Sequence, residues 1–116
     1  MKLSAKTIEK LIGIITGDSK VSPYRSGTQL IAFFRDFGER DLYGQGFPSR
    51  GAYTKEKLEK FDGMDVMRGI ISNAFDFFDA DGLDPEAAAE DFNRTLVRDG
   101  YRLALEYRRS WMEGDR

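Results

Sequence analysis

The sequence predicts a mainly α-helical protein, a compact bundle of about five short helices joined by long ordered loops. Apolar residues recur at helical spacing along most of the chain, residues that cap helices precede these stretches, and glycines follow several of them. The chain has 116 residues, of which 41% are apolar and 13% aromatic, enough for one core. We therefore expect residues 1–116 to form a single domain.

The first two helices have the clearest boundaries. Ser4 is expected to cap the first helix, which ends at Gly17 and carries a stripe of apolar residues at i, i+3, i+4 and i+7: Ile8, Leu11, Ile12 and Ile15. Ser26 and Gln29 have the spacing of a capping box. The second helix then continues to Gly38 with the stripe Leu30, Phe33, Phe34 and Phe37.

Three more helices are expected. Thr54 caps a short third helix, ending before Gly63, that carries Leu58 and Phe61. The fourth helix carries Val66, Met67, Ile70, Ile71, Ala74 and Phe75. The fifth has the strongest start in the chain, because Asp84 is a capping residue and Pro85 suits the first helical position. It carries Ala88, Phe92 and Leu96 and ends at 99–100.

The hydrophobic period changes after Gly100. Apolar and polar residues alternate over about eight positions, which favours a short C-terminal β-strand. A lone strand leaves backbone groups unpaired, so it needs a partner strand from Ser110 onward, as in a hairpin, or from another chain. A helix over 101–107 remains open, since Leu, Ala, Glu and Arg all favour helices.

The chain contains neither cysteine nor histidine. This excludes a disulfide framework, a thiol nucleophile, a Ser-His-Asp triad and histidine ligands for zinc. No apolar run approaches the roughly 18–20 residues of a membrane span, and the polar start is unlike a signal peptide. We therefore expect a cytoplasmic protein that makes no membrane contact, with no catalytic residue, metal site or cofactor assigned.

Charge is distributed unevenly around a net value of -2. Residues 1–58 carry ten Lys or Arg and six Asp or Glu, whereas residues 59–116 carry eight and fourteen. The isoelectric point is near 5.2, and no run of Lys or Arg exceeds two residues, which disfavours a dedicated nucleic-acid binder.

Two loops in the basic half are the candidate site. Residues 23–27 and 43–50 each combine Pro or Gly with an aromatic ring, a hydroxyl and an arginine. Backbone N–H groups at a helix start attract anions, and arginine offers a planar fork. If the loops meet, they are expected to bind an anionic ligand, a nucleotide or a nucleic-acid phosphate, through Tyr24, Arg25, Ser26, Gly27, Tyr43, Ser49, Arg50 and Tyr53. The alternative is structural: prolines and glycines set turns, and the arginines pair with carboxylates.

Two further stretches look like known binding motifs but lack the required residues at the required positions. Residues 44–46 suggest a nucleotide-binding glycine fingerprint, but Ser49 stands where its third glycine belongs. Residues 79–82 suggest a calcium loop, but Phe77 and Ala88 occupy the positions that need carboxylates. Only one acidic cluster could support a metal-dependent nuclease, the enzymatic alternative: Asp76, Asp79, Asp81 and Asp84.

Large aromatic residues near the C-terminus indicate an interface. Tyr107 and Trp111 stand in an otherwise polar segment and need a surface to pack on, either on this domain or on a partner. A homo-oligomer that pairs through the C-terminal strand is one such arrangement.

The loops also carry a family resemblance. Residues 17–18, 23–27, 33–38, 43–50, 53–54 and 57–58 together resemble the N-terminal domain of bacterial abortive-infection-like proteins. The resemblance covers roughly residues 4–105 and implies an N-terminal module that precedes a separate C-terminal effector domain in phage defence. Domains of this kind end in a polar hairpin, whereas 107–111 is bulkier here.

Three functions follow from these observations. The first is a non-enzymatic recognition or assembly domain of a defence protein, whose partner is the effector domain or another protein. The second is a nucleic-acid-binding module. The third is a dimerisation or docking domain with no small ligand.

Overall fold

The computed structural model describes residues 1–78 and 82–105 of the chain. Five α-helices and one short 3-10 helix account for most of these residues: α1 (Ala5–Thr16), α2 (Gly27–Arg35), α3 (Arg50–Phe61), α4 (Val66–Ala74), α5 (Pro85–Leu96) and η1 (Val97–Asp99). This confirms the predicted mainly α-helical bundle.

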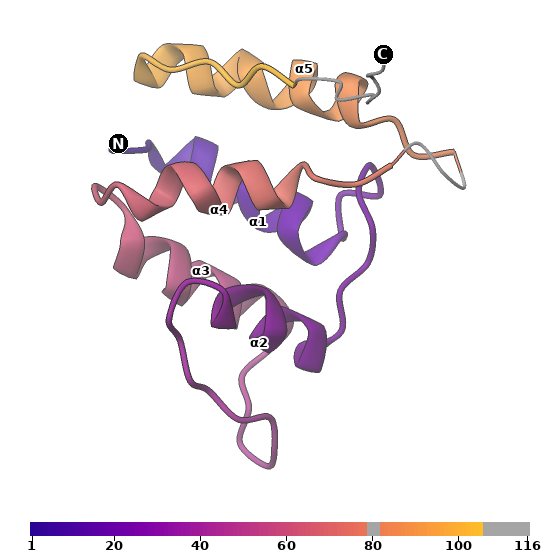
Figure 1. Ribbon diagram of the computed structural model, residues 1–116, viewed down its shortest axis with the longest axis vertical. Coiled ribbons are helices and arrows are strands. Elements are labelled where there is room, and N and C mark those ends of the chain that lie inside the picture. The colour runs from indigo at the N-terminus through magenta and orange to yellow at the C-terminus, as the bar shows by residue number, and fades with distance from the viewer. Residues whose placement is uncertain (79–81, 106–116) are drawn as a thin grey trace, which may run out of the picture.

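Helix α1 lies at the centre of the bundle and packs against α3, α4 and α5. In Figure 1, α5 lies at one end of the long axis, α1 and α4 lie in the middle, and α2 and α3 lie toward the other end. The loop between α2 and α3 projects beyond them at that end. The largest fully buried side chains come from every helix of the bundle and include Leu11, Ile15, Phe34, Leu58, Met67, Ile70 and Phe92.

Capping explains where three of the helices begin. The hydroxyl of Ser4 accepts a hydrogen bond from the Thr7 amide, as predicted for α1. Ser26 and Gln29 form the predicted capping box at α2, and Asp84 accepts from two amides at the start of α5. Left-handed Gly17, with φ of 82°, ends α1.

The predicted start of α3 was wrong by about one turn. The helix begins at Arg50, because the Ser49 hydroxyl accepts from the Ala52 amide. Thr54 lies inside the helix, is fully buried and donates its hydroxyl to the Arg50 carbonyl. The earlier start means that Arg50 and Tyr53 extend from a helix and not from a loop.

Residues 101–105 form no β-strand in the part of the chain that the structure describes. Left-handed Gly100, with φ of 95°, reverses the chain after η1, and the segment runs back along α5 (Figure 1). The Tyr101 amide donates to the Leu96 carbonyl. The rest of the expected strand or hairpin, together with Tyr107 and Trp111, lies outside the described residues.

We expect Phe34→Ala to destabilise the protein by about 3–5 kcal/mol, because Phe34 is fully buried and contacts both Phe33 and Tyr53. Leu42→Ala should change the free energy of unfolding by less than about 0.5 kcal/mol, because Leu42 is 86% exposed. Urea unfolding of the two variants measures the difference, and equal losses would contradict the assigned core.

Candidate recognition surface

The two predicted loops meet in the structure. Arg50 Nε donates to the Arg25 carbonyl over 2.7 Å. The ring of Tyr43 lies so close to Gly27 that a β-carbon at that position would clash with the ring. A larger residue at the first position of α2 would therefore displace the Tyr43 ring.

Arg50 directs its guanidinium group into the protein. Its Nη2 donates to the Thr16 carbonyl over 2.6 Å, and its Nη1 pairs with Asp18 Oδ1 at 3.0 Å. The group also lies over the ring of Tyr24, 4.1 Å from the ring centroid. Together with the bond to Arg25, these contacts join the end of α1, the first loop and the start of α3.

Arg25 is also held by internal contacts. Its Nη1 donates to the Ile15 carbonyl over 2.9 Å, and its guanidinium lies 4.7 Å from the centroid of the Phe33 ring. Burial lowers the pKa of Arg25, but the guanidinium group remains charged at neutral pH. Both guanidinium groups thus donate to main-chain carbonyls of the protein itself.

The hydroxyl-bearing residues of the predicted set also have internal partners. The hydroxyls of Ser26 and Ser49 cap α2 and α3. The Tyr53 hydroxyl donates to Asp41 over 2.8 Å, and its ring is only 3% exposed. Of the eight predicted ligand-binding residues, Tyr24 and Tyr43 present large exposed side chains, 62% and 58% respectively.

A cluster of ion pairs around buried Lys57 holds residues 39–41, which lead into the second loop, on α3. Lys57 Nζ lies 2.6 Å from Glu39 and 2.7 Å from Asp41, and Lys60 pairs with Glu39 at 2.7 Å. Sequence reasoning missed this cluster. A one-turn spacing of Lys57 and Lys60 on a helix, opposite two acids in the preceding loop, was the available signal.

Each group of the cluster stabilises the charged form of its partner. Hydrogen bonds from Lys57 and Lys60 lower the pKa of Glu39, and those from Lys57 and Tyr53 lower the pKa of Asp41. Burial by itself would lower the pKa of Lys57, but its bonds to Asp41 and Glu39 outweigh burial and raise it. Burial and the bond to Asp41 raise the pKa of Tyr53, so Tyr53 is an unsuitable base at neutral pH.

A series of tilted and edge-on aromatic contacts anchors the same loop to the core. The rings of Tyr43 and Phe47 lie 4.8 Å apart, as do those of Phe47 and Tyr53, and Tyr53 contacts buried Phe34. We call residues 39–49 the recognition loop. A hollow of about 440 Å³ lies between this loop and the α3 side chains Tyr53, Glu56 and Lys57.

The recognition loop displays an apolar side chain that nothing in the described chain covers. Leu42 is 86% exposed, and its neighbours in sequence are Asp41, which is held by Lys57, and Tyr43, which packs on Phe47. Ion pairs and ring contacts therefore fix the backbone on both sides of Leu42, so the exposed leucine has a defined position.

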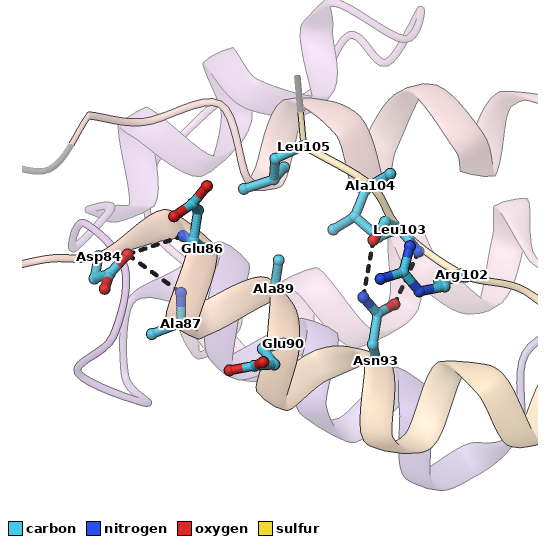
Figure 2. Close-up of a pocket in the computed structure, with 10 residues that line it drawn as sticks. All are labelled: Asp84, Glu86, Ala87, Ala89, Glu90, Asn93, Arg102, Leu103, Ala104 and Leu105. Carbon is cyan, nitrogen blue, oxygen red and sulfur yellow. Dashed lines mark hydrogen bonds between the residues drawn. The ribbon is translucent and has the colours of Figure 1, made fainter. Parts of the chain in front are cut away.

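A second hollow lies between α5 and the segment 101–105 (Figure 2). The side-chain amide of Asn93 bonds both the amide and the carbonyl of Leu103, each over 2.8 Å, and so fixes the segment on the helix. The segment departs from α5 beyond that point and leaves a hollow of about 570 Å³. Its charged lining residues are Asp84, Glu86, Glu90 and Arg102, and alanine and leucine side chains make up half of the lining.

Metal-binding and membrane-spanning features also bear on function. In residues 1–78 and 82–105, no three acidic side chains gather closely enough to hold a metal ion. Asp79 and Asp81 of the predicted acidic cluster lie outside these ranges. No described helix has the length and apolar character that crossing a membrane requires.

Replacing Arg50 tests whether its role is structural. Arg50→Ala should destabilise the protein by about 2–3 kcal/mol, because it removes charge-assisted hydrogen bonds to Thr16, Arg25 and Asp18. Arg50→Lys should lose part of that amount, since lysine keeps the charge without the planar fork. Exposed Arg40→Ala is the control in urea unfolding. An unchanged stability of Arg50→Ala would instead support a guanidinium available to a ligand.

The ion-pair cluster predicts acid sensitivity. Glu39 and Asp41 have lowered pKa values in the folded protein, so their contribution is present above their unfolded values, about pH 4, and is lost as the pH falls through the folded values. The free energy of unfolding should therefore decline from about pH 5 to pH 3. Lys57→Met should be less stable at pH 7 and lose less stability over this range. Parallel profiles for the two proteins would contradict the assignment.

Comparisons of the chain with protein-family models, with curated proteins and with solved structures gave no match. Function is therefore inferred from the geometry of the recognition surface.

Proposed function

We propose that the chain is a non-enzymatic recognition or assembly domain that contacts its partner through the recognition loop. The single observation that carries this proposal is the fixed, exposed Leu42. Its side chain is 86% exposed although the loop around it is held by the Lys57 ion pairs and the Tyr43–Phe47–Tyr53 rings. Leu42 and Tyr43 are adjacent in sequence and both exposed, and adjoining apolar and aromatic surface on an ordered loop is a feature of protein-binding sites.

The energetic argument favours a protein partner. Covering a leucine completely contributes about 1.5–3 kcal/mol. A loop that is already ordered loses little conformational entropy on binding, so more of this gain remains as affinity. Tyr24 and Tyr43 add exposed aromatic surface, and tyrosine is enriched in protein interfaces.

The anionic-ligand version of the proposal has weaker support. A nucleotide or nucleic-acid phosphate at Arg25 and Arg50 would compete with the carbonyls of Ile15, Thr16 and Arg25 for the same N–H groups. The docking version, with no small ligand, requires no such exchange. The exposed apolar side chain of Leu42 favours it over the nucleic-acid-binding alternative.

The biological setting in this proposal comes from the resemblance to abortive-infection-like proteins. In that setting the chain is a cytoplasmic module of a phage-defence protein, and its partner is a C-terminal effector domain or another copy or component of the system. The module supplies recognition, and the partner supplies any chemistry.

A matched pair of surface variants tests this function. Leu42→Asp should leave the thermal midpoint within about 2 °C of the wild type, because the side chain is not in the core, but abolish protection of cells against phage. Met64→Asp is the control, since Met64 is 50% exposed in the turn between α3 and α4. The measurement is the plating efficiency of phage on cells that express the defence protein.

Protection by Leu42→Asp equal to that of the wild type would contradict a role for the recognition loop. Loss of protection in Met64→Asp as well would indicate a general effect of added charge. Failure of the wild type to restrict any of a broad phage panel would contradict the defence setting.

A further inference from the structure

A third hollow, more apolar in character, lies far from the recognition loop. It has a volume of about 270 Å³ and opens between α1, the turn that follows α1, and α5. Buried Ile14 and Phe92 and half-exposed Val21 provide apolar lining. The polar residues around it are Glu9, Lys10, Ser19 and Asp91.

The volume of this hollow suits one large side chain. Pockets for drug-sized ligands and cofactors usually measure about 300–1,000 Å³, so a hollow of 270 Å³ falls just below that range. An inserted aliphatic side chain would exchange water for contact with Ile14, Val21 and Phe92. The chain itself displays such a side chain in Leu42.

The charges beside the two features are complementary. Arg40, two residues before Leu42, is exposed and pairs with no acid in the described part of the chain. Glu9, at the hollow, is exposed and likewise has no basic partner among the described residues. Asp91 lies beside it and pairs with Lys10 at 2.9 Å and with Arg94 at 3.6 Å. An arginine that accompanies Leu42 would therefore approach Glu9, the carboxylate at the rim that has no basic partner among the described residues.

The recognition loop and the hollow lie apart along the long axis of the molecule. Figure 1 shows the recognition loop projecting beyond α2 and α3 at one end of the long axis, whereas α5, which borders the hollow, lies at the other end. Leu42 cannot reach the hollow of its own chain. A contact between them joins two copies head to tail, and each copy retains one unused loop and one unused hollow.

We propose that Leu42 of one copy inserts into the hollow between α1 and α5 of the next, with Arg40 beside Glu9, so that the domain assembles head to tail into chains or rings larger than a dimer. This inference rests on the proposed recognition role of the loop and names its partner as a second copy. The contact is small and therefore weak, with association expected at about 0.1–1 mM in the isolated chain. Tethering to other domains would raise the effective concentration.

Sedimentation equilibrium of the chain and two complementary variants tests this assembly. The wild-type average mass should rise above 13.2 kDa with concentration and continue past the dimer. Leu42→Asp blocks the loop, and Val21→Arg blocks the hollow, so each variant alone should remain monomeric. An equimolar mixture should form a heterodimer that grows no further, because one intact loop meets one intact hollow.

Charge reversal provides a second test, which does not depend on whether Val21→Arg folds correctly. Glu9→Arg should weaken association at least about tenfold through repulsion of Arg40, and Arg40→Glu in the same chain should restore it. Met64→Asp should associate like the wild type. Either a wild type that stays monomeric at 1 mM, a closed dimer, or the absence of charge-swap rescue would overturn the proposal.

These results are separable from the proposed function. If the wild type is monomeric but Leu42→Asp still abolishes phage protection, the loop binds a different partner and only the self-assembly is wrong. If the chain self-associates as described but Leu42→Asp protects normally, assembly is real and the loop has no role in defence.

Discussion

The guanidinium group of Arg50 is the contact on which the arrangement of the candidate surface depends. It donates to the carbonyls of Thr16 and Arg25 and pairs with Asp18, so one side chain joins the end of α1, the first loop and the start of α3. Its planar fork can satisfy several acceptors in fixed directions at once. The two loops meet because this group lies between them.

Two kinds of contact, ion pairs and aromatic ring contacts, fix the recognition loop. Lys57 pairs with Glu39 and Asp41 and Lys60 pairs with Glu39 where the loop approaches α3, and tilted ring contacts connect Tyr43 through Phe47 and Tyr53 to the core. These contacts use most of the polar and aromatic groups of the loop internally. Leu42 is left exposed in a fixed position, and this combination of order and apolar exposure distinguishes the loop from a mobile connection.

Many local features of the fold were predictable from the sequence. Apolar periodicity and capping residues identified the five helices, and the capping box of Ser26 and Gln29 formed as expected. The start of α3 was misjudged because Ser49 and Thr54 are both capping residues, and only burial of Thr54 inside the helix shows which one acts. The alternation after Gly100 indicated a strand, but Asn93 holds the described part of that segment on α5 as irregular chain.

The sequence by itself determined the helical class, the caps of α1, α2 and α5, and the absence of cysteine and histidine chemistry, and it predicted residues 23–27 and 43–50 as candidate loops. Only the tertiary structure decided that the two arginines turn inward and that Leu42 remains exposed. The physical reason is the range of the interactions involved. Helix periodicity and capping act over three or four residues, whereas the hydrogen-bond partners of the Arg50 guanidinium lie 25 to 34 residues away in the chain.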